Sequence, residues 1–403
     1  MKTNYIALSI PVFFILIGVE LLVCWIQGKK YYRLNDSLSN LAQGIGQQVT
    51  GIFFKVIIGF FYLYLYDTYK IFPNIPNALW VWVVLFFSVD FFYYWFHRMS
   101  HEVNAMWAAH IVHHQSEDYN LTVALRQSWF QSFFSLFFYL PLALVGFDPI
   151  MFVTVSSFNT LYQFWIHTQT IGKLGPLEWI FNTPSHHRVH HGSNPKYIDK
   201  NHAGSLIIWD RLFGTFQEEE EEVYYGITRP LNSWNPIWAN FHYWAELWQL
   251  SKRSSGLRNK LLVFLMPPGW QPKELGGRQF AKEIDPNEYR KYDNRSHTRV
   301  HRYAFFQFVL ILGAASILLF VEKQLTSYQV YGIAFSVIGG LVAVGAYFEN
   351  NRWALGIDLC RLLLIVVVLS TISIPLLKYS ALLFGISIIG WIKLALSKPS
   401  ELV

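Results

Sequence analysis

Residues 81–114 read VWVVLFFSVDFFYYWFHRMSHEVNAMWAAHIVHH, an apolar run that leads directly into five histidines. With the residues just before it, the run covers 78–96, and a helix needs about 17–25 mostly apolar residues to cross a bilayer. In HRMSH, His97 and His101 are four residues apart, on one face of a helix that continues out of the span. HIVHH places His110, His113 and His114 at i, i+3 and i+4, which also share a face. The stretch predicts a helical membrane protein with a histidine site at the end of a span.

A second histidine cluster lies in residues 183–192, TPSHHRVHHG, so that nine of the 14 histidines fall in two short windows. Thr183 can cap a helix, Pro184 suits its first position and Gly192 suits its end. We therefore expect a short helix between them. The histidines of this helix are His186, His187, His190 and His191.

The number of imidazoles in the two windows indicates a site for two metal ions. One zinc ion takes four ligands, or three and a water molecule, and eight or nine histidines exceed that need. Imidazole suits zinc, copper, iron and nickel, so the ligand type leaves the metal open. Two first-row metals held by neutral nitrogens at a membrane face favour oxygen activation over hydrolysis, and hence iron. A structural metal site or a metal transporter is the alternative.

The composition also indicates a membrane protein. Of the 403 residues 53% are hydrophobic and 14% are charged, whereas soluble domains carry about 25% charged residues. The formal net charge is +6, but the basic residues lie between apolar runs and form no single patch. We therefore expect no nucleic-acid partner. Cys24 and Cys360 both lie in apolar runs, which gives no support for a disulfide framework.

The apolar runs predict an all-α, polytopic membrane protein with about nine transmembrane helices. We interpret the first run as a span and not as a cleaved signal peptide, because no small-residue cleavage site follows it. Lys29, Lys30 and Arg33 follow this run, and basic loops favour the cytoplasmic side. The histidine site is then cytoplasmic and the N-terminus lies outside. The expected spans are 5–27, 45–66, 78–96, 128–146, 150–167, 303–322, 328–347, 356–378 and 380–397.

The chain divides into two expected parts. Residues 1–302 contain about five spans, a cytoplasmic cap and every histidine, and residues 303–403 contain four further spans. We expect the second part to pack beside the catalytic spans. Its few charges, Arg361 and Lys378 among them, lie near span ends where such side chains can reach water. Small residues around Gly339 and Gly340 suit close helix packing.

Three carboxylates are candidates for catalytic or supporting roles. Asp90 lies seven residues before His97 on the same helical face, inside an apolar span. A carboxylate there is costly and by default functional, so we expect it to face a ligand histidine or a network that touches one. Glu102 and Asp118 are further candidates, for which an ordinary surface role is an equal alternative.

The histidine motifs match the three-box pattern of a known superfamily. HRMSH, HIVHH and HHRVHH resemble the boxes of the fatty acid hydroxylase and sterol desaturase superfamily. Longer stretches resemble its alkylglycerol monooxygenase family, and the resemblance covers residues 1–302 well. These stretches are FHRMSHEVNAMWAAHIVHHQSEDYNLTVALRQS (96–128), LYQFWIHT (161–168), GPLEWIFNTPSHHRVHHGSN (175–194) and IDKNHAGSLIIWDRLFGTF (198–216).

The resemblance implies a di-iron centre with O2 as co-substrate. Its eight ligands are the box histidines His97, His101, His110, His113, His114, His187, His190 and His191. His186, in the same run, is a ninth candidate. His167 ends QFWIH (163–167) and fits a place where several relatives carry HxxxH. His202 stands where the alkylglycerol enzymes are expected to carry tyrosine.

The implied reaction is hydroxylation of the carbon next to the ether oxygen of an alkylglycerol, followed by collapse to a fatty aldehyde and a glycerol product. The resemblance also implies tetrahydrobiopterin as the electron donor, although no residue spacing indicates a pterin pocket; a redox protein is the alternative donor. The implied partners are a membrane lipid substrate and the bilayer itself, in a bacterial inner membrane or, in a eukaryote, the endoplasmic reticulum. A fatty-acyl, sterol or carotenoid hydroxylase or desaturase is the second interpretation, and a non-catalytic metal-binding membrane protein is the third.

Overall fold

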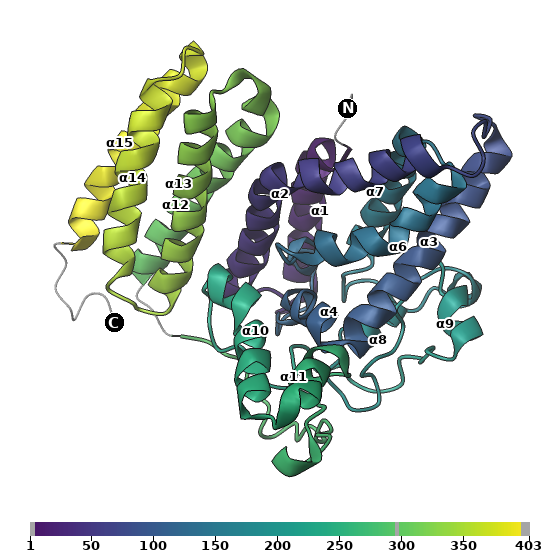
Figure 1. The fold of residues 1–403 in the computed structure, drawn as a ribbon. Coiled ribbons are helices and arrows are strands. Elements are labelled where there is room, and N and C mark those ends of the chain that lie inside the picture. Colours follow the sequence, from purple (N-terminus) through teal and green to yellow (C-terminus); the bar gives the residue numbers. More distant parts are fainter. Residues whose placement is uncertain (1–4, 295–297, 396–403) are drawn as a thin grey trace. The chain divides into compact units, whose positions relative to one another are not determined.

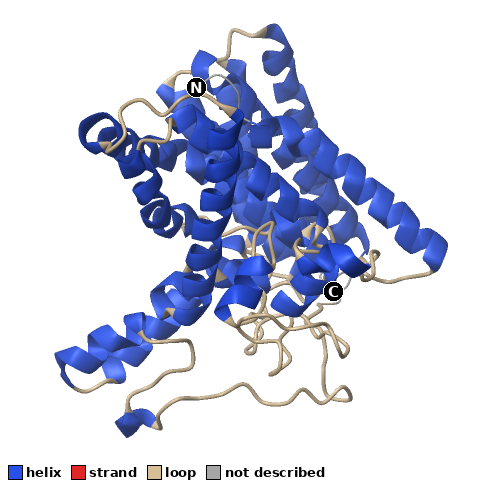
Figure 2. Ribbon diagram, turned by 90° about the vertical axis from the view of Figure 1, so that its right-hand side faces the viewer, coloured by secondary structure: helices blue, strands red, loops and turns tan. Residues whose placement is uncertain are grey.

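The computed structural model describes residues 5–294 and 298–395, and all regular structure in these ranges is helical (Figures 1 and 2). Two isolated bridges, Phe181 with Leu206 and Gly192 with Tyr225, are the only strand-like pairings among the described residues. The α-helices are α1 (Tyr5–Gln27), α2 (Leu34–Tyr69), α3 (Leu79–Glu102), α4 (Asn104–Ala108), α5 (Ile111–His114), α6 (Gln131–Val145), α7 (Pro149–Trp165), α8 (Pro184–His190), α9 (Ile208–Phe213), α10 (Pro236–Arg253), α11 (Gly256–Leu265), α12 (Thr298–Val321), α13 (Ser327–Phe348), α14 (Ala354–Ser370) and α15 (Pro375–Ala395). Short 3-10 turns lie at Val123–Leu125, Gly175–Trp179, Lys273–Leu275 and Glu322–Gln324.

The described chain forms two compact units that alternate along the sequence. The first combines Met1–Arg33, Phe54–Leu231 and Asn240–Arg290, and the second combines Leu34–Phe53, Asn232–Ala239 and Lys291–Val403. The chain thus passes from one unit to the other within α2 and within α10. The expected boundary after residue 302 separates a catalytic from a supporting part, and as a functional division it stays a prediction.

In the first unit, α3 packs against α6 and α7 (Figure 1). Val81, Leu85 and Val89 recur at helical spacing on α3, and they are buried in one cluster with Leu142 of α6 and Val155 of α7. Apolar residues at this spacing form the stripe by which a helix joins a core. Further along α3 the buried residues include the polar side chains of Asp90, His97 and His101. The buried face of α3 therefore provides both core residues and candidate site residues.

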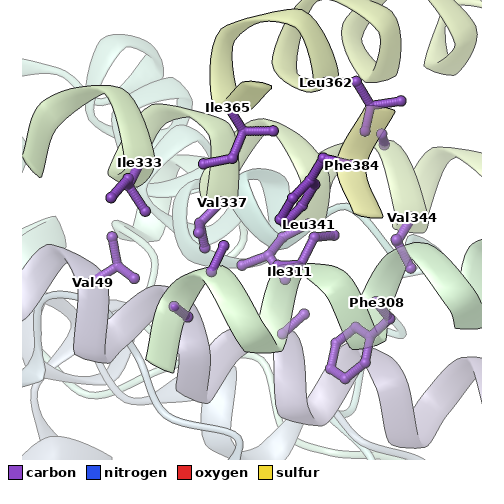
Figure 3. Close-up of a cluster of buried hydrophobic side chains, with 14 of the residues drawn as sticks. Val49, Phe308, Ile311, Ile333, Val337, Leu341, Val344, Leu362, Ile365 and Phe384 are labelled. Atoms are coloured by element: carbon purple, nitrogen blue, oxygen red, sulfur yellow. The ribbon is translucent and has the colours of Figure 1, made fainter. Parts of the chain in front are cut away.

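In the second unit, α12, α13, α14 and α15 pack as neighbours together with the first part of α2. Figure 3 shows their shared core, in which Val49 of α2 lies with Ile311, Val337 and Leu341. Close helix packing on α13 depends on its small residues. A Cβ at Gly340 would lie 2.7 Å from the Ile311 Cδ1 atom. This agrees with the close approach expected for the small residues of this helix.

The expectation that Arg361 reaches water near a span end is wrong. Its side chain is buried inside the second unit, where its Nε donates to the Oδ1 of Asp358 at 2.8 Å. The hydroxyls of Tyr303 and Tyr347 donate to the same carboxylate at 2.6 and 2.9 Å. The charge is therefore neutralised within the bundle by a partner three residues earlier on α14. The side chain of Lys378 lies outside the described residues.

Four described helices are long and apolar enough to cross a membrane, and a fifth is added if the bent α2 forms one span. The four are Leu8–Gln27, Leu79–Glu102, Thr298–Gln324 and Ser327–Phe348. They overlap four expected spans, and α2 overlaps the expected span 45–66. The helices α6, α7 and α14 have 15, 17 and 17 residues and are shorter than the four candidate spans. Residues 396 and 397, the last two of the expected span 380–397, lie outside the described residues. The structure thus supports a multi-pass helical protein, and the count of nine stays a prediction.

Candidate metal centre

Three short segments bring the two histidine windows together. His97 and His101 occupy the last turns of α3, and His110, His113 and His114 lie at and within α5. The second window forms α8, from Pro184 to His190, as its flanking residues predicted. The expectation that Thr183 caps the helix is wrong: it precedes the helix without a capping hydrogen bond, and its hydroxyl donates to the Oε1 of Glu178 at 2.9 Å.

The histidines converge into two groups, each of which can hold one metal ion. Within each group, one donor atom per residue lies within 4.8 Å of every other. The two groups are adjacent, since the His114 and His191 rings lie 4.4 Å apart. All nine side chains are buried. The first group is His97, His101, His110, His114 and His190, and the second group is His113, His167, His187 and His191.

Hydrogen bonds to backbone carbonyls determine which ring nitrogens are free. The Nδ1 of His113 lies 2.9 Å from the Arg126 carbonyl oxygen, and the Nδ1 of His167 lies 2.7 Å from the Gln163 carbonyl oxygen. A carbonyl only accepts, so both Nδ1 atoms carry the proton and both Nε2 atoms present lone pairs. These two Nε2 atoms face each other at 3.2 Å. Two lone pairs at this distance repel unless a cation lies between or beside them.

A proton is a poor candidate for that cation. Burial, together with the neighbouring imidazoles, holds the pKa of His113, His187 and His191 well below the usual value. Burial also lowers the pKa of His110 to about 4. The rings are therefore neutral at neutral pH, which is the state in which imidazole binds metals.

Unpaired nitrogens support the same conclusion. Within the described part of the chain, the Nε2 atoms of His101, His190 and His191 are buried and have no hydrogen-bond partner. Buried polar atoms are nearly always paired. A metal ion in each group would use these lone pairs, and an all-nitrogen donor set suits a first-row transition metal such as iron. The residues present thus fit a two-metal centre.

Comparison with known proteins places this geometry in a family. A family model for fatty acid hydroxylase matches residues 82–215, which include both histidine windows. Alkylglycerol monooxygenase of Xenopus tropicalis is 40% identical over 363 residues, which cover 90% of this chain and 81% of that protein. The chain belongs to the alkylglycerol monooxygenase family. The human member is 46% identical over 314 residues, covering 77% of this chain and 70% of that protein. No solved structure matches the chain.

For this member of the alkylglycerol monooxygenase family, the structure brings together nine of the ten histidines expected as ligands. His167, which follows α7, joins the second group, with its Nε2 3.0 Å from that of His187. The structure does not bring His186 into either group. Its ring packs against Phe216 at 5.4 Å. Because His186 directly precedes His187 on α8, it points to a different face of the helix.

Asp90 organises the loop behind the centre, and among the described interactions it makes no hydrogen bond with a grouped histidine. Its carboxylate is fully buried and accepts hydrogen bonds from the backbone N–H groups of Ser205 and Leu206 at 2.7 and 3.1 Å. The Nδ2 of Asn159 donates to Asp90 at 2.6 Å, and the Nε2 of Gln163 donates to the Oδ1 of Asn159 at 2.9 Å. The Gln163 carbonyl in turn accepts from His167. The network from Asp90 therefore reaches the candidate ligand His167 through two amide side chains.

The other two carboxylates lie in different surroundings. Glu102 forms an ion pair with Arg98 at 2.8 Å, and about a third of its side chain is exposed. Asp118 accepts from the backbone N–H and the Nε of Arg33 at 3.2 and 3.0 Å. No hydrogen bond joins either carboxylate to the two groups among the described interactions. Their catalytic roles stay predictions.

Sequence reasoning missed the groups that hold the Nδ1 atoms. The Nδ1 of His110 lies 3.1 Å from the Oε1 of Gln131, and that of His190 lies 2.9 Å from the Lys200 carbonyl oxygen. Glu20 was also missed, although a carboxylate inside the first apolar run was a visible signal. It accepts from the Leu121 N–H at 2.8 Å and from the hydroxyls of Tyr32 and Thr168. Thr168 directly follows the ligand candidate His167, so Glu20 ties α1 to the centre.

Proposed function

We propose that this chain is a membrane-bound, O2-dependent di-iron monooxygenase that cleaves the ether bond of alkylglycerols. The observation that carries the proposal is the pair of adjacent all-histidine groups in a chain 40–46% identical to alkylglycerol monooxygenases. Several apolar helices fit a multi-pass membrane protein, which suits an enzyme whose substrate is a lipid.

Nine histidines would hold the two iron ions, which would supply the activation of O2. The first group offers five nitrogens and the second offers four. The protein contributes orientation: carbonyl oxygens fix the Nδ1 protons of His97, His113, His167 and His190, which directs each Nε2 inward. Such outer partners make the ligands more basic and hold the ring planes. Asp90 positions the loop that supplies two of these carbonyls, those of Lys200 and His202.

The reaction inserts one oxygen atom of O2 into the C–H bond next to the ether oxygen. The second oxygen atom leaves as water, with two electrons and two protons from the donor. The resulting hemiacetal breaks its C–O bond to give a fatty aldehyde and a free glycerol hydroxyl. Tetrahydrobiopterin is the proposed donor, and a redox protein is the alternative.

For the membrane arrangement, we propose nine spans with the histidine centre on the cytoplasmic side. The charges after α1 support this orientation, because Lys29, Lys30 and Arg33 form a short basic loop and such loops favour the cytoplasm. Labelling single cysteines introduced at Lys29 and in the 218–222 loop with a membrane-impermeant reagent tests it. Labelling from outside intact cells at either position would exclude this topology.

The test of function is turnover by iron-loaded membranes that contain the protein. We expect fatty aldehyde from an alkylglycerol when O2 and a tetrahydropterin are both present, and none after exhaustive chelation or without O2. A free fatty acid and a sterol of matched chain length or area serve as comparison substrates. If the protein hydroxylated or desaturated the fatty acid or the sterol and did not cleave the ether, it would be a fatty-acyl or sterol hydroxylase or desaturase instead. Metal binding without turnover of any of the lipids would indicate a non-catalytic protein.

A further inference from the structure

His202 lies beside the first histidine group without belonging to it. Its side chain is completely buried. The backbone of Asp199 can accept from one ring nitrogen, and within the described chain the other has no hydrogen-bond partner. Buried polar side chains are almost always paired. A buried imidazole with an unpaired nitrogen is therefore not accounted for by packing alone.

The surroundings of the ring point to the first group. Its centroid lies 5.0 Å from that of His101, 5.6 Å from that of His190 and 5.8 Å from that of His97. Rings inside the first group are separated by similar distances, 5.4 Å for His97 and His101. Among the ring contacts of the described residues, those of His202 with other histidines are all with the first group. The ring thus adjoins the first group.

The backbone at His202 is held from both directions. Its N–H donates to the Oδ1 of Asp210 at 2.8 Å, and its carbonyl oxygen lies 2.7 Å from the Nδ1 of His97. On either side of Lys200, Asp199 and Asn201 adopt left-handed φ angles of 57° and 55°, which non-glycine residues adopt rarely. A constrained loop therefore places this imidazole against the first group.

We propose that His202 is a sixth nitrogen donor to the metal ion of the first group. The inference rests on the proposed two-metal function of the site. Its donor atom lies outside the set that is mutually within 4.8 Å, so coordination draws the ring toward His101 and His190. The first metal would then have six histidine donors and the second metal four.

The test compares metal binding by three variants of the full-length protein in detergent, at equal folded amounts. In His202→Ala the proposed donor is removed while its backbone contacts stay. His101→Ala removes a member of the first group, and His186→Ala removes a buried histidine of α8 that lies outside both groups. Loss of even an outer partner of a ligand costs about 10–100-fold in metal affinity. We therefore expect His202→Ala to lower the affinity for one of the two metal ions by at least about 10-fold. His186→Ala should leave the affinity for both ions unchanged.

Cobalt substitution gives a readout that is independent of activity. The visible absorption of Co2+ strengthens as its coordination number falls, so His202→Ala should absorb more strongly than the wild type. Added imidazole, which can occupy the vacated space, should reverse this change. A second substitution, His202→Asn, retains a polar side chain and serves if the alanine variant does not fold.

The outcomes separate this inference from the function on which it rests. If the wild type binds two metal ions, while His202→Ala matches its affinity and its cobalt spectrum and His101→Ala does not, His202 is no ligand. If the changes occur but imidazole fails to reverse them, the residue acts through packing and the proposal is also wrong. If the wild type itself binds no metal ions, the proposed function fails first.

Discussion

The backbone carbonyls of Arg126, Gln163 and Lys200 each lie within 2.9 Å of the Nδ1 of a histidine in the two groups. Each carbonyl fixes one tautomer and leaves Nε2 free to bind a metal. The consequence is that the metal-free site holds lone pairs against one another. Metal binding and stability are therefore coupled in this protein.

Chelation should reveal this coupling. We expect removal of metal to lower the thermal unfolding temperature of the full-length protein, because a ligand at 100 times its Kd stabilises by about 2.7 kcal/mol. Thermal unfolding in detergent, before and after chelation and after the return of Fe2+ or Zn2+, measures the effect. Recovery with Zn2+ but without turnover would separate stability from catalysis. An unchanged unfolding temperature would contradict a metal between His113 and His167.

A second prediction concerns Asp90. Asp90→Asn replaces an acceptor oxygen by an N–H2 group that faces donors such as the Trp209 Nε1, 2.9 Å away. We expect iron affinity or turnover to fall by about 10–100-fold, as for other outer partners of metal ligands. Asp358→Asn, a buried aspartate of the second unit, is the matched control and should leave iron per folded protein unchanged. Equal iron content and equal turnover in Asp90→Asn would make Asp90 a packing residue.

Spacing in the sequence predicted which histidines meet, but it could not predict what holds them. The i, i+3 and i+4 pattern by itself indicated eight of the nine grouped histidines. The carbonyl that holds His97 belongs to His202, 105 residues later, and backbone carbonyls leave no signature in a sequence. His186 was expected as a ligand because it adjoins the box, but adjacent positions on a helix face different directions.

At the level of elements, the loop between α8 and α9 positions the grouped histidines together with the helices that carry them. It supplies the carbonyl that holds His97, and Asp90 binds its N–H groups. This approach depends on Gly204: a Cβ there would lie 2.9 Å from both the Asp90 Oδ1 and the Tyr93 Cδ1, and 3.0 Å from the Asn159 Oδ1. The sequence predicted α8 from its flanking residues, but it gave no indication that this glycine adjoins α3.

Gly204→Ala should therefore displace the loop from α3. We expect a loss of about 1–3 kcal/mol in unfolding free energy, as for other overpacked sites, together with weaker iron binding. Thermal unfolding and iron content at equal folded protein measure the two effects. Gly18→Ala is the control, since a Cβ at this helical position of α1 meets nothing within 4 Å. If both variants behaved alike, the close approach at Gly204 would not matter.

For the whole molecule, the two compact units do not follow the linear division after residue 302. Leu38, Val49 and Ile52, from the first third of the chain, are buried in the same cluster as residues of α12–α15. Long-range packing of this kind has no local pattern, which is why the sequence did not predict it. The partner of Arg361 was visible, since Asp358 is one helical turn away, and opposite charges at i and i+3 pair on one helix face.

Arg361 gives the test of whether the second unit supports the protein without taking part in the metal centre. Arg361→Ala leaves the Asp358 carboxylate buried without its cation, and breaking a buried pair in this way costs about 3–5 kcal/mol. We expect a lower unfolding temperature with two iron ions per folded molecule retained. Chemical unfolding and iron analysis on the full-length chain provide both measurements.

The control for Arg361→Ala is the double replacement Asp358→Leu with Arg361→Met. Exchanging both members of a buried pair for apolar residues of similar size is often neutral or stabilising, so the double variant should recover most of the lost stability. If the single variant loses stability, the double variant recovers it and the iron content stays constant in both, the pair serves only the packing of its own bundle. Loss of iron from a stable, folded double variant would contradict this separation, because the defect would then follow the charges and not the packing. The Asp358–Arg361 pair would in that case contribute to the metal centre.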